Sequence, residues 1–173
     1  MNLSQTSKKS YDVILAALIA ALYVVLTYFS SMFGLAFSGI QLRISEVLTI
    51  LPVFTPAAIP GLTIGCFISN LSSPYGLVDL IFGTAMTFIC AVLTRLFRNI
   101  KIKEIPFFSF FPPVIVSAIF VATLTTLILP QDIIMYPYWM AFFITLVSQS
   151  IVCYGLGVPL FILIRKIGIF KGE

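Results

Sequence analysis

An arginine and a glutamate lie three residues apart in the stretch GIQLRISEVLTILPVFTPAAIPG, which runs from Gly39 to Gly61. Arg43 and Glu46 come directly before a run apolar enough to enter a lipid bilayer. An ionisable side chain at membrane depth is costly unless it is paired or hydrated, so each of these residues is a hypothesis for a ligand contact. The same spacing also allows the two side chains to neutralise one another at a helix start, where a carboxylate suits the helix dipole. Both interpretations stay open at this stage.

Four further polar side chains are expected at about the same depth in the membrane as Arg43 and Glu46, and each of them could have a structural role in place of a ligand contact. Asn70 either binds a ligand or caps the end of its helix, and Gln149 either binds a ligand or bridges two helices. Asp79 is a ligand contact or a first-turn acid of its helix. Trp139 stacks on a planar ligand or belongs to an interfacial aromatic belt. We predict that these four residues join the two charges in one substrate-binding site.

Several kinds of chemistry are missing from the sequence. The chain has no histidine, which excludes a histidine general base, a Ser/His triad and the commonest metal ligand. Cys66, Cys90 and Cys153 lie inside apolar runs without a CxxC spacing, as buried small hydrophobic residues do. There is also no GxxxxGK[ST] phosphate loop. We therefore predict a binding protein without catalytic residues, metal ligands or a cofactor, and not an enzyme.

The composition predicts an integral membrane protein. Of the 173 residues, 60% are hydrophobic and 9% are charged, whereas a soluble domain is about 25% charged. The formal net charge of +4 is accounted for by basic residues that flank apolar segments, so it does not call for a nucleic-acid partner. The partner that this composition implies is the lipid bilayer.

Six apolar segments can be drawn along the chain, which we predict to be an all-α membrane protein. We expect residues 1–173 to form one membrane domain, a compact bundle of six transmembrane helices. The expected helices cover approximately 11–30, 44–54, 56–71, 76–97, 106–129 and 136–167. The second is short, and Pro52, Pro56 and Pro60 interrupt its junction with the third. Such interruptions are tolerated at membrane depth where they are packed in protein or line a cavity.

The basic residues predict the orientation of the bundle. With six spans, nine of the ten lysines and arginines fall on one side of the membrane: Lys8, Lys9, Arg95, Arg98, Lys101, Lys103, Arg165, Lys166 and Lys171. Basic loops stay in the cytoplasm, so both termini are expected there. Arg43 is then the basic residue on the outer side, and the predicted site faces outward.

Small residues recur at helical spacing in the first segment. Ala16 and Ala20, or equally Ala17 and Ala21, lie four residues apart in ILAALIAALYVV. Small residues at this spacing let another helix approach closely. The approaching helix belongs either to the same bundle or to a partner protein.

The stretches QLRISEVLTILPVFTPAAIPGLTIGCFISNL and GLVDLIFGTAMTF, together with the alanine-rich first helix, resemble a known group. The chain is similar over nearly its whole length to the substrate-binding S components of energy-coupling factor (ECF) transporters. Within that group it resembles the QueT family, which takes up queuosine precursors. The resemblance implies a six-helix bundle in a prokaryotic plasma membrane that binds a 7-deazaguanine, a queuosine precursor or queuine, near its outer face. It also implies a transmembrane coupling subunit, met through Ala16 and Ala20, and two ATPase subunits that use ATP.

Given such a ligand, each polar residue acquires an expected role. Glu46 suits the N1 and N2 donors of the base, as a bidentate carboxylate acceptor. Arg43 either locks that carboxylate or reaches the O6 acceptor. Asp79 would face the amine of the aminomethyl precursor, and Asn70 and Gln149 would complete the base edge.

Other functions are compatible with parts of the sequence. The alternatives are an S component for another vitamin-like substrate and a small structural membrane protein of the cell-shape type. The structural class does not need a polar outer pocket, so protection by a ligand distinguishes the two. An intramembrane enzyme is disfavoured by the missing histidines and by the lack of a carboxylate cluster of the kind that metal catalysis uses.

Overall fold

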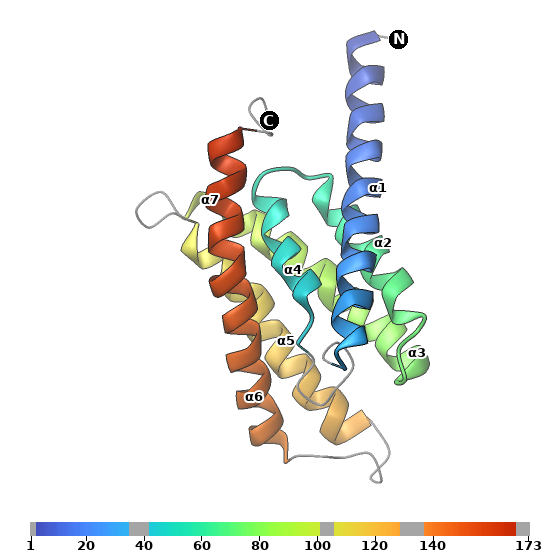
Figure 1. Ribbon diagram of the computed structural model, residues 1–173, viewed down its shortest axis with the longest axis vertical. Coiled ribbons are helices and arrows are strands. Elements are labelled where there is room, and N and C mark those ends of the chain that lie inside the picture. Colours follow the sequence, from blue (N-terminus) through green and yellow to red (C-terminus); the bar gives the residue numbers. More distant parts are fainter. Residues whose placement is uncertain (1–2, 35–41, 101–105, 129–136, 169–173) are drawn as a thin grey trace.

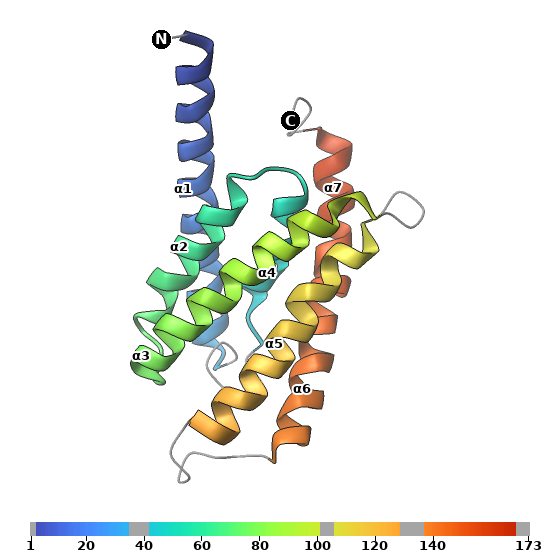
Figure 2. The same ribbon diagram turned by 180° about the vertical axis from the view of Figure 1, so that it is seen from behind.

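The structure, a computed structural model, describes residues 3–34, 42–100, 106–128 and 137–168. These residues form helices and no strand, so the predicted all-α class is confirmed. Six helical segments lie side by side in one bundle (Figures 1 and 2). In chain order they are α1 (Leu3–Met32); the 3-10 helix η1 (Ile44–Val53); α2 (Ala58–Asn70); α3 (Gly76–Val78) with the π-helical η2 (Asp79–Gly83), α4 (Thr84–Leu96) and η3 (Phe97–Asn99); η4 (Phe107–Phe110) with α5 (Phe111–Thr123) and the π-helical η5 (Leu124–Ile128); and α6 (Tyr138–Ser150) with the π-helical η7 (Ile151–Leu156) and α7 (Gly157–Ile167).

Four of the six segments are long and apolar enough to cross a membrane. They are Lys8–Met32, Gly76–Asn99, Phe107–Thr126 and Tyr138–Ile167. The helices η1 and α2 have 10 and 13 residues. At roughly 2.0 Å per residue for a 3-10 helix and 1.5 Å for an α-helix, each is about 20 Å long, shorter than a hydrocarbon core of about 30 Å. The prediction of six helices, with a short second one, therefore agrees with the structure.

The short helix η1 lies inside the bundle. Its buried residues are Ser45, Glu46, Leu48, Thr49, Ile50, Leu51 and Pro52. It contacts α1, α2, α4 and α7, and Figure 1 shows it in cyan among these helices. Arg95 of α4 donates a hydrogen bond of 2.9 Å to the carbonyl oxygen of Pro52, which satisfies an acceptor that a helix end leaves open. An interrupted helix is thus packed in protein, as the prolines predicted.

Two glycines of α2 bring that helix close to α1. A Cβ atom added to Gly61 would lie 2.7 Å from the carbonyl oxygen of Ala16, and one added to Gly65 would lie 2.9 Å from that of Ala20. Any larger residue would therefore push the two backbones apart. This close approach places Tyr23, one turn further along α1, against the first turn of η1.

The interior changes character along the long axis of the bundle. The ends of the described chain, in α1 and α7, lie at one end of the molecule (Figures 1 and 2). The interior of that half is an apolar core that includes Ile19, Leu51, Leu62 and Ile164. The buried charged residues lie toward the opposite end, where η1 begins and α2 ends.

Candidate functional site

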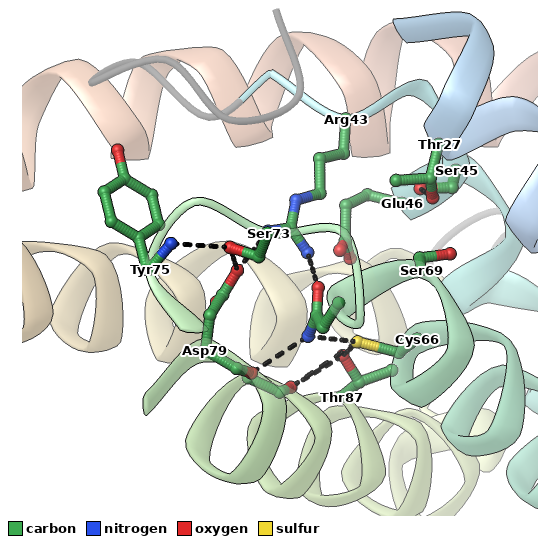
Figure 3. Close-up of polar contacts among 12 residues, drawn as sticks. Thr27, Arg43, Ser45, Glu46, Cys66, Ser69, Ser73, Tyr75, Asp79 and Thr87 are labelled. Atoms are coloured by element: carbon green, nitrogen blue, oxygen red, sulfur yellow. Dashed lines mark hydrogen bonds and ion pairs between the residues drawn. The ribbon is translucent and has the colours of Figure 1, made fainter. Parts of the chain in front are cut away.

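Arg43 begins the site, because it precedes η1 and its side chain crosses to two other helices. The backbone of Arg43 is extended, with φ −99° and ψ 114°. Arg43 is therefore not part of the helix η1, which begins at the next residue. Nη1 donates to Oδ1 of Asn70 at 2.9 Å, and Nη2 donates to Oδ2 of Asp79 at 3.0 Å (Figure 3). Only 5% of Arg43 is exposed. The guanidinium is therefore held by a buried ion pair and an amide.

The turn between α2 and α3 fixes this ion pair. Ser73 donates a hydrogen bond of 2.7 Å to the same Oδ2 atom of Asp79, and the backbone N–H of Tyr75 donates to the Ser73 hydroxyl at 3.2 Å (Figure 3). The amide nitrogen of Asn70 donates to the backbone carbonyl of Asp79 at 3.0 Å. The end of α2 and the start of the next segment are thereby tied together behind the guanidinium.

Gly83 leaves the space that this network occupies. A Cβ atom at this position would lie 2.8 Å from Nδ2 of Asn70 and 2.9 Å from Oδ1 of Asp79. Asp79 and Gly83 are the two ends of the π-helical turn η2. Single π-turns inside α-helices are frequent at functional sites, because they change the direction of side chains locally. Here the turn places the Asp79 carboxylate next to Gly83, whose lack of a side chain leaves room for it.

Glu46 lies on the first turn of η1 and is held by α1. The Tyr23 hydroxyl donates to Oε1 of Glu46 at 3.1 Å, and both residues are buried. One turn further along α1, Thr27 donates a hydrogen bond of 2.8 Å to the Ser45 hydroxyl. A carboxylate accepts at about four positions, so the bond from Tyr23 leaves acceptor capacity for the donors of a ligand.

The polar groups meet at one small cavity. It is lined by Arg43, Glu46, Asp79, Gly83, Met86, Ser117, Phe120, Val121 and Gln149. Its volume is about 10 Å³, whereas small-molecule pockets measure about 300–1,000 Å³. A planar base therefore enters only if the surrounding helices or side chains move apart. The lining combines charged and amide groups with apolar walls, which is the composition that orients a flat polar ligand.

The structure brings most of the predicted site residues together. Arg43, Glu46, Asp79 and Gln149 line the cavity, while Asn70 contacts Arg43 from behind it. Asp79, which we expected to face a ligand amine, lines the cavity, and its Oδ2 atom accepts hydrogen bonds from Arg43 and Ser73.

Trp139 lies apart from this group. Its side chain is 69% exposed at the start of α6, where its ring makes edge contacts with Tyr138 and Phe142. The structure does not place it at the cavity. Such a position suits the alternative of an interfacial aromatic residue.

The sequence did not indicate several residues of the site, among them Tyr23, Ser73, Gly83 and Ser117. One signal was available for Tyr23, because Tyr23, Thr27 and Ser30 recur at i, i+4 and i+7 in a mostly apolar stretch of α1 and so share one face. A single serine or glycine within an apolar run carries no comparable signal.

The predicted partner surface forms a groove along α1 and α2. Its lining includes Ala16, Ala17, Ala20, Ala21, Pro60 and Ile64, and its volume is about 780 Å³. Ala20 is only 6% exposed, and its backbone lies against Gly65. Ala17 and Ala21 are exposed. The small residues of α1 therefore serve the packing of α2 on one side and leave an apolar groove beside it.

The comparison with known proteins gives the chain its family. A family model described as QueT transporter matches residues 13–166. The Queuosine precursor transporter QueT of Lactococcus lactis subsp. cremoris (strain MG1363) is 40% identical over 81 residues, which cover 47% of this chain and 47% of that protein. No solved structure matches. With four helices that are long and apolar enough to span a bilayer, the chain is a multi-pass membrane protein, and the match over most of its length shows that it belongs to the QueT transporter family.

Proposed function

We propose that this protein is the substrate-binding S component of an ECF transporter and captures a 7-deazaguanine, a queuosine precursor or queuine. The observation that carries the proposal is a buried pair of opposite charges, Arg43 and Asp79, beside a second buried carboxylate, Glu46, at one cavity of a QueT-family chain. A structural membrane protein does not need such a group of charges, because each of them is costly to bury. The relative from Lactococcus lactis is named for the same class of substrate.

The contacts assign a role to each charge. Glu46, held at one oxygen by Tyr23, offers its remaining acceptor positions to the N1 and N2 donors of the base. Arg43, held by Asp79 and Asn70, presents its guanidinium to the O6 acceptor. Gln149 completes the base edge from α6. In this proposal Asp79 positions Arg43 and also lines the cavity near the aminomethyl group.

The orientation follows from the basic residues at the end of the bundle where α1 begins and α7 ends (Figures 1 and 2). Lys8 and Lys9 lie near the start of α1, and Arg165 and Lys166 lie in the last turn of α7. We propose that this end faces the cytoplasm of a prokaryotic cell and that the cavity opens toward the outside.

The protein binds and does not catalyse, in this proposal, so the energy for transport comes from partners. A transmembrane coupling subunit would pack into the groove along α1 and α2, where Ala17 and Ala21 permit a close helix contact. Two ATPase subunits would bind and hydrolyse ATP. The proposal does not include a cofactor in this chain. Loss of uptake on filling this groove, without loss of ligand binding, is the test of the partner surface.

The substitution Glu46→Gln tests the substrate proposal. It replaces one acceptor oxygen by an amide donor that faces the donors of the base. Loss of one partner of a buried charged hydrogen bond costs about 2 to 5 kcal/mol, which is roughly 30-fold to several thousand-fold in affinity. We expect that loss in Kd when the purified variant is titrated with the aminomethyl 7-deazaguanine. A surface ion pair would cost at most about 1 kcal/mol.

Two controls make the result specific. Asp12→Asn makes the same chemical change in α1, at a residue that does not line the cavity, and should leave Kd unchanged. Adenine reverses the pattern of donors and acceptors at the base edge, so the wild type should reject it. A loss of less than fivefold for Glu46→Gln, or adenine bound as tightly as the deazaguanine, would contradict the assignment. Binding of a different vitamin-like compound in place of the deazaguanine would favour an S component of another specificity.

A further inference from the structure

Ser117 carries a hydroxyl that the protein leaves without a hydrogen bond. Among the described residues, five buried hydroxyl oxygens have no partner, namely those of Thr84, Thr94, Ser109, Ser117 and Thr145. Ser117 is 1% exposed, and of these five it is the one that lines the cavity of Arg43, Glu46, Asp79 and Gln149. Buried polar atoms without a partner are rare in native proteins, and each calls for an explanation.

Other hydroxyls at the end of the same helical segment behave differently. Thr123 donates to the carbonyl oxygen of Ile119 at 2.8 Å, and Thr126 donates to that of Ala122 at 2.6 Å. Bonding to the carbonyl four residues earlier is the usual way for a serine or threonine to be satisfied within a helix. Ser117 does not make this bond, so its hydroxyl remains available to a group in the cavity.

The surroundings of Ser117 make this hydroxyl distinctive. Ser117, Phe120 and Val121 follow one another at i, i+3 and i+4 on α5 and therefore share a face, and all three line the cavity. Among the described residues that line the cavity, Ser117 carries the hydroxyl on the apolar wall, whereas the charged groups are Arg43, which precedes η1, and residues of η1 and η2. A hydroxyl both donates and accepts, so it suits an edge atom of a base that the charged groups do not reach.

We infer that Ser117 is a ligand contact of α5 that orients the base between the charged groups and the apolar wall. This inference rests on the proposed function, because the same cavity must hold the deazaguanine. It adds a polar contact from α5, whose other lining residues are apolar, to the polar groups that Arg43, η1, η2 and α6 contribute to the binding site. Ser117 has its hydrogen-bond partner in the liganded protein and lacks one in the ligand-free protein.

The substitution Ser117→Ala tests the inference because its two effects have opposite signs. In the ligand-free protein it removes a buried polar atom that has no partner, so the thermal midpoint in detergent should stay the same or rise. In the complex it removes a hydrogen bond, so the affinity for the aminomethyl 7-deazaguanine should fall about tenfold. A serine with a purely structural role would not produce this combination.

Ser109→Ala is the matched control. Ser109 is fully buried, its hydroxyl also has no partner, and it lies in η4 outside the cavity lining. Like Ser117→Ala, the Ser109→Ala substitution should leave the thermal midpoint unchanged or raise it. Unlike Ser117→Ala, it should leave Kd unchanged. If Ser117→Ala changes Kd by less than twofold while the wild type binds, the inference is wrong and the proposed function stands. If the wild type does not bind any deazaguanine, the proposed function fails and the inference falls with it. A lowered thermal midpoint for unliganded Ser117→Ala would show a structural hydroxyl and would also overturn the inference.

Discussion

The two halves of the bundle interior are held together by different interactions. Near the chain ends, Leu51, Leu62 and Ile164 pack in an apolar core. Toward the other end, Arg43 and Asp79 form a buried ion pair, and the buried Glu46 accepts a hydrogen bond from Tyr23.

The same helices contribute to both halves. In a bilayer, apolar side chains gain little by leaving lipid, so an apolar core is held mainly by van der Waals packing and tolerates exchange of similar shapes. Each buried polar group must instead find its particular partners, because unsatisfied groups are costly at membrane depth. The polar half of the interior is therefore the more constrained one, as expected where a ligand is recognised.

The largest effect is expected from Arg43→Met. The substitution leaves Asp79 buried without its guanidinium, and removing one partner of a buried ion pair costs about 3 to 5 kcal/mol. We expect a loss of unfolding free energy of that size in detergent, measured by denaturant titration, together with loss of deazaguanine binding. The double substitution Arg43→Met/Asp79→Asn should recover most of the stability and none of the binding. A stability loss below about 1 kcal/mol would equate the pair with a surface salt bridge and contradict the comparison.

Leu62→Ala is the control from the apolar half. Leu62 is fully buried in the apolar core, and Leu→Ala substitutions in a core cost about 2 to 5 kcal/mol because they leave a cavity. The variant should lose stability and keep the wild-type Kd within about twofold, under conditions where it is folded. This result would show that a loss of stability does not by itself weaken ligand binding.

An intermediate effect is expected from Gly83→Ala. The added Cβ atom would come within 2.8 Å of Nδ2 of Asn70, so the amide and the ion pair behind it must shift. Overpacking of this kind costs about 1 to 3 kcal/mol, and we expect that loss in unfolding free energy and a weaker Kd. Gly155→Ala in η7 is the control, because apart from the backbone and chain neighbours of its own helix nothing lies within 4 Å of its Cβ position. Equal tolerance of both substitutions would show that the polar half is not tightly packed around Gly83.

The smallest effect on the isolated protein is expected from Ala21→Leu. Ala21 is exposed in the groove of α1 and α2, so a leucine there should change stability by no more than about 0.5 kcal/mol. It should nevertheless abolish uptake by cells, because it fills the groove that the coupling subunit is proposed to enter. Uptake assays and ligand titration of the purified variant measure the two effects. Normal uptake would place the partner surface elsewhere.

Most of the architecture was predictable from the sequence, but the pairing within the site was not. Apolar run lengths indicated the six helices, and the three prolines indicated the interrupted second helix. The i, i+3 spacing of Arg43 and Glu46 left open whether they neutralise one another or bind a ligand, and it did not indicate that Arg43 bonds Asn70 and Asp79 or that Glu46 bonds Tyr23. Spacing describes neighbours along one helix, and these partners come from three other elements.

Burial was equally hard to predict for side chains in apolar spans. Trp139 and Gln149 lie on the same helix, and one is 69% exposed while the other is 4% exposed. In a helix that is apolar all round, the hydrophobic pattern does not mark the inward face. The buried hydroxyl of Ser117 was hidden for the same reason.

By itself the sequence determined a membrane protein of six helices with Arg43, Glu46 and Asp79 near one level of its spans, because segment length and polarity decide what can enter lipid. Only the tertiary structure decided which charge pairs with which, that the glycines of α2 bring α1 to Glu46, and that Ser117 faces the polar cavity. The physical reason is that hydrogen bonds and close packing depend on the directions of side chains from several helices at once, and these directions are set when the helices pack.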